Sequence, residues 1–218
     1  MDKIIALQNI KGGKWVAVLF ESGESLTLDQ ETTIRAGLCK GCSIDQRKKQ
    51  ELVENADFME CYDAALHYLS YRLRSEVELR KYLMDKKNFK EVTTDRVVDK
   101  LKKLKLIDDV AFAKSWRDDR IRFYPRSRFL IRRELLQKGI TGKTIDEITS
   151  GIDDEKNAYA IGLKRAKLLS SSSFEEFYRK LGGFLARRGY NREIVNTTVR
   201  RLWESRNAGA GECKDFND

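Results

Sequence analysis

The chain has 218 residues, with 43 Lys and Arg against 34 Asp and Glu, and its formal net charge is +9. A hydrophobic fraction of 41% can build a folded core, which excludes a wholly disordered chain, and a single proline among 35% charged residues favours helices with solvated faces. The apolar stretches are too short for a membrane span or a signal peptide, so we expect a cytoplasmic protein with no membrane partner.

Residues 1–56 predict a small strand-rich module. Alternating, β-branched and aromatic residues indicate three short strands, at 3–10, 15–20 and 25–28. Asp29 has the residue type of an N-cap for a helix through Arg35, and a charged helix at 44–55 leads out of the module. Because a bare hairpin is not stable in water, we expect this sheet to pack on a helix.

Cys39 and Cys42 form a CxxC on a glycine turn of this module. A zinc site needs a second close pair, whereas Cys61, His67 and Cys213 are isolated. A redox motif opens a helix after a strand, which this turn does not do. We therefore expect reduced thiols, no bound metal and no other cofactor.

Helical periodicity begins after residue 56 and continues along the chain. Its longest apolar stripe comprises Phe174, Phe177, Tyr178, Leu181, Phe184 and Leu185. Ser75, three residues before Glu78, has the spacing of a capping box, and a serine among residues 170–173 is expected to cap the helix that carries this stripe.

One pattern recurs at nearly constant spacing. A helix that contains Leu83, Leu135 or Leu185 ends in a basic turn, and a further helix precedes and follows it. The turns contain Gly139 and Gly189, residues suited to a C-cap with positive φ, and Asn88 can take the same role in the first copy. The alternative is one compact all-α domain with accidental spacing.

These patterns together predict a mainly α protein with three tandem three-helix repeats, in an elongated and curved array, after a small N-terminal β-rich module. The predicted boundaries are 1–56 for the strand-rich module with its linking helix, 57–107, 108–152 and 153–206 for the three repeats, and 207–218 for a flexible tail.

The residues offer no recognisable active site, so we expect no enzyme. His67 is the only histidine and has no paired nucleophile nearby in the sequence. The Gly142-Lys143-Thr144 segment lacks the first glycine of a P-loop, because Gln137 stands there, and we expect Thr141 or Thr144 to cap a helix instead.

Positive charge is concentrated in the predicted repeats. Residues 57–203 hold 33 Lys and Arg against 22 Asp and Glu, whereas residues 1–56 hold eight of each. This excess predicts a polyanionic partner. The candidate binding residues are Lys102, Lys103, Arg120, Arg122, Arg126, Arg128, Arg132, Arg133, Arg187, Arg188, Arg192, Arg200 and Arg201. Phe123 and Tyr124 lie among them, and we expect a core role for both, with stacking on bases as the alternative.

Four segments resemble the successive motifs of the RecX family, in the same order and with the same spacing. They are Ala65–Leu83, Leu106–Ala113, Ile131–Ile140 and Leu185–Tyr190, and the resemblance covers about residues 58–203. The module at 1–56 lies outside this core and is similar to a strand-rich extension of some members.

The resemblance implies a regulator of the RecA recombinase. Members of the family bind in the groove of the recombinase filament on single-stranded DNA and modulate filament growth, strand exchange and LexA cleavage, usually as inhibitors of recombination, DNA repair and the SOS response. The expected partners are therefore the RecA filament and, more weakly through phosphates, single- or double-stranded DNA, for a protein that is itself a monomer. The alternative function is a stand-alone basic nucleic-acid-binding repeat protein.

Overall fold

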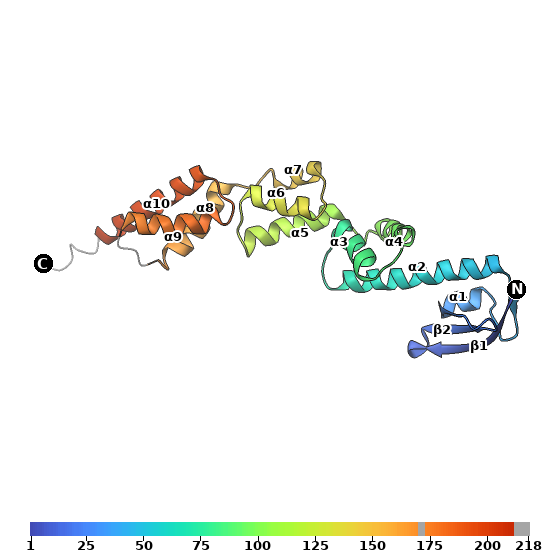
Figure 1. The fold of residues 1–218 in the computed structure, drawn as a ribbon. Coiled ribbons are helices and arrows are strands. Elements are labelled where there is room, and N and C mark those ends of the chain that lie inside the picture. Colours follow the sequence, from blue (N-terminus) through green and yellow to red (C-terminus); the bar gives the residue numbers. More distant parts are fainter. Residues whose placement is uncertain (170–172, 212–218) are drawn as a thin grey trace. The chain divides into compact units, whose positions relative to one another are not determined.

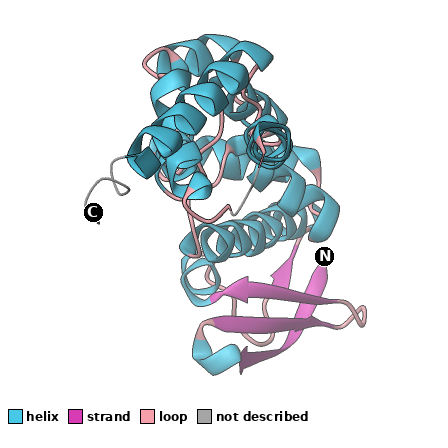
Figure 2. Cartoon of the chain, turned by 90° about the vertical axis from the view of Figure 1, so that its left-hand side faces the viewer, coloured by secondary structure: helices cyan, strands magenta, loops and turns pink. Residues whose placement is uncertain are grey.

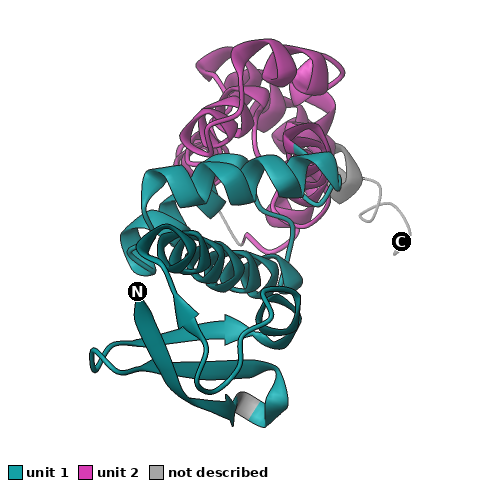
Figure 3. Cartoon of the chain, turned by 90° about the vertical axis from the view of Figure 1, so that its right-hand side faces the viewer, with its two compact units in different colours: residues 1–108 teal, residues 109–218 magenta. Residues whose placement is uncertain are grey.

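The computed structural model describes residues 1–169 and 173–211, and the chain forms two compact units (Figure 3). Unit 1 comprises residues 1–108 and unit 2 comprises residues 109–218. Helices dominate both units, and the strands are confined to the N-terminal module of unit 1 (Figure 2). The predicted fold class, a small β-rich module followed by three helical repeats, is confirmed.

The N-terminal module is a four-stranded antiparallel sheet in the order β3-β2-β1-β4. The three predicted strands are present as β1 (Asp2–Ile10), β2 (Trp15–Phe20) and β3 (Ser25–Asp29). β4 (Ser43–Ile44) was not predicted, because two residues are too few to show an alternating pattern. It pairs with β1 at the edge of the sheet.

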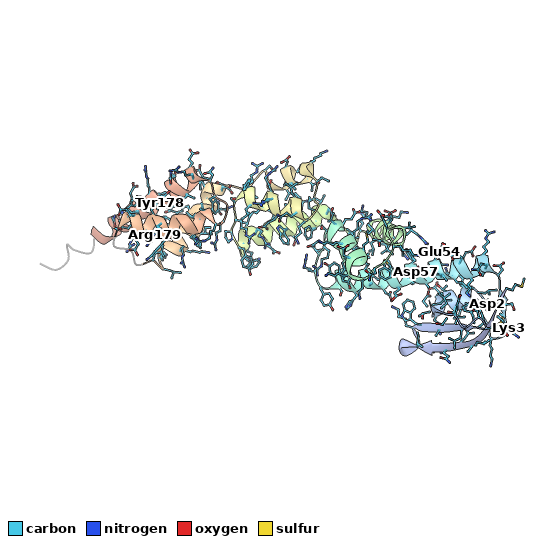
Figure 4. All side chains as sticks on the ribbon, viewed as in Figure 1. Asp2, Lys3, Glu54, Asp57, Tyr178 and Arg179 are labelled. Carbon is cyan, nitrogen blue, oxygen red and sulfur yellow. A yellow bond between two sulfur atoms is a disulfide. The ribbon has the colours of Figure 1, made fainter. Side chains whose placement is uncertain are left out.

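A short helix and a long helix complete the module. α1 (Gln30–Arg35) begins as predicted at Asp29, whose carboxylate accepts a hydrogen bond from the backbone N–H of Thr32 at 2.9 Å. Leu52 of the long helix packs against the buried face of the sheet. The Asp2 carboxylate at the start of β1 (Figure 4) accepts a hydrogen bond from the Lys49 ammonium at 2.6 Å, which lowers the pKa of Asp2 to about 2.

The long helix, α2 (Gln46–Ser70), corrects one prediction. We expected separate helices at 44–55 and 57–72, but the structure has one continuous helix of 25 residues (Figure 1). No glycine or proline interrupts this segment, so nothing in it breaks the backbone ladder. Leu52 and Ala56 belong to the core of the sheet module, whereas Cys61 and Ala65 belong to the core of the first repeat.

The first repeat combines the second half of α2 with α3 (Glu76–Lys81), a π-helical turn at Tyr82–Lys86 and α4 (Glu91–Lys103). The Ser75 hydroxyl accepts a hydrogen bond from the backbone N–H of Glu78 at 3.2 Å, which confirms the predicted cap. The buried core includes Leu79, Leu83, Val97, Val98 and Leu101.

The π-helical turn explains why the turn residue of the first repeat is displaced. The left-handed residue follows Leu135 and Leu185 by four positions in the later repeats, at Gly139 and Gly189, but follows Leu83 by five positions, at Asn88. One extra residue in the helix accounts for that shift. The φ angles of Asn88, Gly139 and Gly189 are 57°, 81° and 85°, so the predicted positive-φ caps are confirmed.

The second repeat consists of α5 (Asp109–Arg122), α6 (Arg128–Gln137) and α7 (Gly142–Thr149). The Thr141 hydroxyl accepts a hydrogen bond from the backbone N–H of Thr144 and so caps α7, as predicted. Ile131, Leu135, Ile140, Ile145 and Phe112 are buried together in the core.

The third repeat consists of α8 (Asp154–Ala166), α9 (Phe174–Ala186) and α10 (Arg192–Gly211). Its core is built from the apolar stripe of α9 together with residues of the two flanking helices. Ser173 caps α9 through the backbone N–H of Glu176, whereas the other serines proposed for this role, 170–172, lie outside the described residues.

α10 extends beyond the predicted start of the tail at residue 207. Ala208 and Ala210 favour continuation of the helix, which ends at Gly211. Residues 212–218 of the predicted tail, including Cys213, lie outside the described part of the chain.

The CxxC of the N-terminal module also differs from expectation, because Cys39 and Cys42 are joined in a disulfide. The backbone N–H of Cys42 donates to the carbonyl of Cys39 at 3.0 Å, and this turn brings the two Cα atoms to 5.4 Å, within the range that a disulfide spans. The thiol of Cys61 is buried in the first repeat, and burial raises its pKa to about 11.

Lys105 gives a direct prediction about stability. It lies two residues after the end of α4 and has a φ of 55°, a left-handed conformation that is unfavourable for a residue with a Cβ. Replacement of Lys105 with glycine is expected to stabilise unit 1 by about 0.5–1 kcal/mol, measured by chemical denaturation. Asn88→Gly serves as the comparison, with a smaller gain because asparagine tolerates this region. A loss of stability in Lys105→Gly would contradict the prediction.

Candidate functional site

The second and third repeats meet at the N-terminus of α6, within unit 2. The backbone N–H of Ser127 donates to the carbonyl of Arg188 at 2.9 Å, and the N–H of Arg128 donates to the carboxylate of Asp154 at 2.7 Å. Both donors belong to the first turn of α6, where no intrahelical acceptor exists. The third repeat therefore supplies acceptors that satisfy the end of a helix in the second.

Gly189 allows the backbones to approach this closely. A Cβ atom at Gly189 would lie 2.6 Å from the Oγ of Ser127 and 2.8 Å from the Cβ of Leu130. Burial at the contact raises the pKa of Asp154 and of Tyr190, and the Tyr190 hydroxyl has no hydrogen-bond partner among the described residues. The contact is thus tightly packed as well as hydrogen-bonded.

A groove of about 350 Å³ lies beside this contact and has walls from both repeats. Phe123 and Pro125 contribute from the segment between α5 and α6, and Ile161, Leu168 and Phe184 contribute from the third repeat. The cations that line it are Arg122, Lys164, Arg165 and Arg188. We call it the junction groove. Its combination of an apolar floor with several cations is suited to a partner that carries both apolar groups and negative charge.

The aromatic ring of Phe184 lies against two of these cations. The guanidinium carbon of Arg188 lies 3.8 Å from the centroid of the Phe184 ring, and that of Arg165 lies 5.6 Å from it. Desolvation lowers the pKa of Arg188, and the positive charges of Arg187 and Arg165 lower it further. Cation–π contacts orient an arginine but leave its charge uncompensated, so these side chains remain available to an anion.

A largely buried carboxylate, that of Glu134, pairs with two further predicted arginines on the second-repeat side. The Glu134 carboxylate accepts hydrogen bonds from the indole Nε1 of Trp116 at 2.8 Å and from the Nε of Arg120 at 2.7 Å, and it also pairs with Arg126. Desolvation lowers the pKa of Arg126, and the charges of Arg120 and Arg188 add to that effect. The structure thus brings Arg120, Arg126 and Arg188 together across the two repeats.

The equivalent position of the first repeat is filled differently. With Ser75 and Ser127 aligned as caps, Tyr68 and Tyr82 correspond to Arg120 and Glu134. The two tyrosine rings are stacked, with 3.9 Å between centroids. An aromatic stack in the first repeat therefore stands at the position of the Arg120–Glu134 ion pair in the second.

The remaining predicted residues do not form one continuous site. Lys102 pairs with Glu76 in unit 1, Arg132 pairs with Asp146 on α7, and Arg201 lies over the ring of Tyr159 at 4.3 Å. Arg128 is half-buried at the start of α6. The others, all with exposed side chains, are Lys103, Arg133, Arg187, Arg192 and Arg200. Internal ion pairs thus occupy several arginines that the sequence alone presents as free.

Phe123 and Tyr124 correct the expectation of a core role, because 60% and 64% of their surfaces are exposed. They directly follow the last residue of α5, Arg122. Arg165 and Phe184 are missing from the predicted set, although both line the junction groove. Both residues are far from Arg122 in the sequence, so no local pattern predicted that they would line the same groove.

The described residues contain no group of three or more His, Cys, Asp and Glu side chains arranged to hold a metal ion. Nε2 of His67 lies 3.1 Å from the hydroxyl of Tyr71, one turn further along the chain. Among the described helices, none is long and apolar enough to cross a membrane.

Three family models match the helical part of the chain. They are described as the first, second and third three-helix domains of RecX, and they match residues 61–101, 108–148 and 153–199.

Whole-chain relatives have the same family name. A regulatory protein RecX of Geobacillus sp. (strain WCH70) is 30% identical over 189 residues, which are 84% of this chain and 69% of the relative. A regulatory protein RecX of Clostridium perfringens (strain SM101 / Type A) is 29% identical over 192 residues, which are 86% of this chain and 89% of the relative.

Two solved structures are similar to this chain. A crystal structure described as regulatory protein RecX has a TM-score of 0.66 at 21% identity and covers 91% of this chain and 98% of its own, so it supports the fold alone. The structure of RecX from Lactobacillus salivarius has a TM-score of 0.58 at 26% identity and covers 67% of this chain and 96% of its own.

Proposed function

Because the chain belongs to the RecX family of regulatory proteins, we propose that it binds the filament of a RecA-type recombinase on single-stranded DNA, in the filament groove, and inhibits it. The processes it would restrain are recombination, DNA repair and the SOS response. The junction groove carries the proposal, because it offers apolar contact and uncompensated positive charge on one surface.

A protein–DNA filament matches both properties of that surface. Acidic and apolar groups of a protein partner suit the floor and the cations of the junction groove, and phosphates suit exposed arginines such as Arg187 and Arg192. Tandem repeats also make binding multivalent, so modest contacts at each repeat add up once the first has formed. Inhibition would follow from occupation of the groove, with no catalytic step by this chain.

Arg165 provides the sharpest test of this proposal. Arg165→Glu is expected to weaken filament binding by about tenfold and to lower its salt dependence, because a cation of the junction groove becomes an anion. The measurement is fluorescence anisotropy of labelled single-stranded DNA coated with recombinase and a non-hydrolysed ATP analogue, at several salt concentrations.

Arg179→Glu is the matched control. Arg179 is an exposed arginine of α9 (Figure 4) that does not line the junction groove, and its replacement changes the net charge by the same amount. Equal losses in the two variants would mean that binding depends on net charge alone, and would overturn the assignment of the groove.

The competing function is a nucleic-acid-binding protein that needs no recombinase, favoured by the many exposed arginines of unit 2. The same labelled DNA without recombinase separates the two. Preference for the coated strand supports the regulator, whereas equal affinity for bare and coated DNA supports the competitor. Recombinase ATPase activity and filament disassembly, measured with added protein, test inhibition directly.

A further inference from the structure

Unit 1 contains a second cationic cavity, which the predicted site did not include. It has a volume of about 330 Å³ and lies where α1, α2 and α4 meet, between the sheet module and the first repeat. The four cations that line it are Arg35, Lys48, Arg96 and Lys100. Among the described residues, no aspartate or glutamate lines it.

Residues of α1, α2 and α4 line this cavity, and those of α2 and α4 recur at helical spacing. Lys48, Leu52, Asn55 and Met59 recur at intervals of four, three and four residues, so they lie on one face of α2. Arg96 and Lys100 are four residues apart on α4. The cavity is therefore formed by regular secondary structure and needs no loop rearrangement to exist.

The two cations from α4 are held by aromatic rings. The guanidinium carbon of Arg96 lies 5.1 Å from the centroid of the Phe58 ring, and the ammonium of Lys100 lies 5.3 Å from that ring and 4.4 Å from the ring of Tyr62. Neither cation has a carboxylate within 4 Å in the part of the chain that the structure describes. An aromatic face fixes the position of a cation without neutralising it, so both charges are available to a ligand.

The other two cations are only lightly compensated. Arg35 pairs with Glu31, and the ammonium of Lys48 lies 3.9 Å from a carboxylate oxygen of Glu51. All four side chains are exposed at the surface. Exposed pairs of this kind exchange readily with water and contribute little to stability. An anion in the cavity can therefore compete for both cations at small cost.

The chemistry of the lining selects a phosphate ester. A guanidinium group can donate two parallel hydrogen bonds to the oxygens of one phosphate, and an ammonium group attracts phosphate as a point charge. The side-chain amide of Asn55 adds a hydrogen-bond donor. The junction groove of unit 2 has an apolar floor, whereas this cavity is lined mainly by polar groups, so an apolar side chain of a protein partner suits it poorly.

We propose that the cavity formed by Arg35, Lys48, Arg96 and Lys100 is a binding site for phosphate esters, either successive phosphates of a single-stranded nucleic acid or the phosphates of a free nucleotide. The site goes beyond the proposed regulation of a filament and does not depend on it. It would give unit 1 a binding role of its own.

The test uses the full chain without recombinase, so its outcome is separate from that of the proposed function. The probe is a fluorescein-labelled thymidine strand of about 12 nucleotides, a length within the usual site size for single strands. Arg96→Gln combined with Lys100→Gln is expected to lower the affinity at least about fivefold and to reduce the slope of log affinity against log salt by about one to two.

Lys81→Gln combined with Lys86→Gln is the matched control, because both lysines are exposed in unit 1 and neither lines the cavity. Its affinity is expected to change less than about twofold. Displacement of the strand by ATP from the unmodified protein, and not from the Arg96/Lys100 variant, would identify free nucleotides as ligands. Retention of the strand at millimolar ATP would identify nucleic acid as the ligand. The proposal would be overturned if the two double variants bound the labelled strand with equal affinity and released it equally to ATP, with unchanged circular dichroism.

Discussion

Replacement of Gly189 with alanine is expected to destabilise unit 2 by about 3–5 kcal/mol, since two penalties act at one position. The first is conformational, because Gly189 has a φ of 85° and L-residues are unfavourable there. The second is steric, because the new Cβ would lie 2.6 Å from the Oγ of the buried Ser127. Chemical denaturation followed by circular dichroism measures the loss.

We expect the second repeat to move away from the third, because that movement relieves the clash. That movement would break the hydrogen bonds from Ser127 to Arg188 and from Arg128 to Asp154, so the N-terminus of α6 would lose its acceptors. Limited proteolysis between α7 and α8 should then become faster. The junction groove should be lost with it, because its walls come from both repeats.

Gly37→Ala separates the two penalties. Gly37 follows the end of α1 with a φ of 63°, and a Cβ added there would have no atom of the described residues within 4 Å, so its replacement adds strain without a clash. We expect a cost of about 1 kcal/mol for that variant. If Gly189→Ala costs no more than Gly37→Ala, the contact between the two repeats is looser than the structure indicates.

Replacement of Glu134 with glutamine is expected to cost about 2–4 kcal/mol and to lower the Tm of unit 2 by about 10 °C or more. The Glu134 side chain is only 12% exposed and serves three donors, from Trp116, Arg120 and Arg126. Glutamine preserves the size but removes the charge, and its amide N–H₂ meets donors instead of acceptors. The arginines would then repel each other without compensation.

This variant also has a predicted effect on binding. Arg120 and Arg126, once released from Glu134, become available to phosphate, so affinity for single-stranded DNA should rise while stability falls. Glu147→Gln is the matched control, because Glu147 is an exposed residue of α7 and its replacement changes the net charge equally. Equal DNA affinities in the two variants would show that Glu134 does not withhold these arginines.

Local signals in the sequence were sufficient for much of the fold. The caps at Asp29, Ser75 and Thr141 act between residues three apart, and the left-handed turn at Gly189 depends on a single residue type. The π-helical turn in the first repeat and the two-residue strand β4 were not predicted, because neither changes the hydrophobic period enough to be seen.

The candidate site was much less accessible to sequence reasoning. Counting arginines located the charge but could not distinguish Arg122, which is exposed, from Arg126, which Glu134 engages eight residues further along the chain. The junction groove joins Phe123 to Phe184, and only the folded contact between repeats places them together. The disulfide between Cys39 and Cys42 likewise depends on a turn geometry that residue types do not specify.

The continuity of α2 has a consequence for insertions and deletions. Ala56 faces the core of the sheet module and Cys61 faces that of the first repeat, so one rigid helix fixes the angular relation between the two sets of contacts. Loss of a single residue between them would rotate every later contact by about 100° around the helix axis. This stretch should therefore accept many substitutions but almost no change in length, except by steps of about seven or eleven residues that restore the same face.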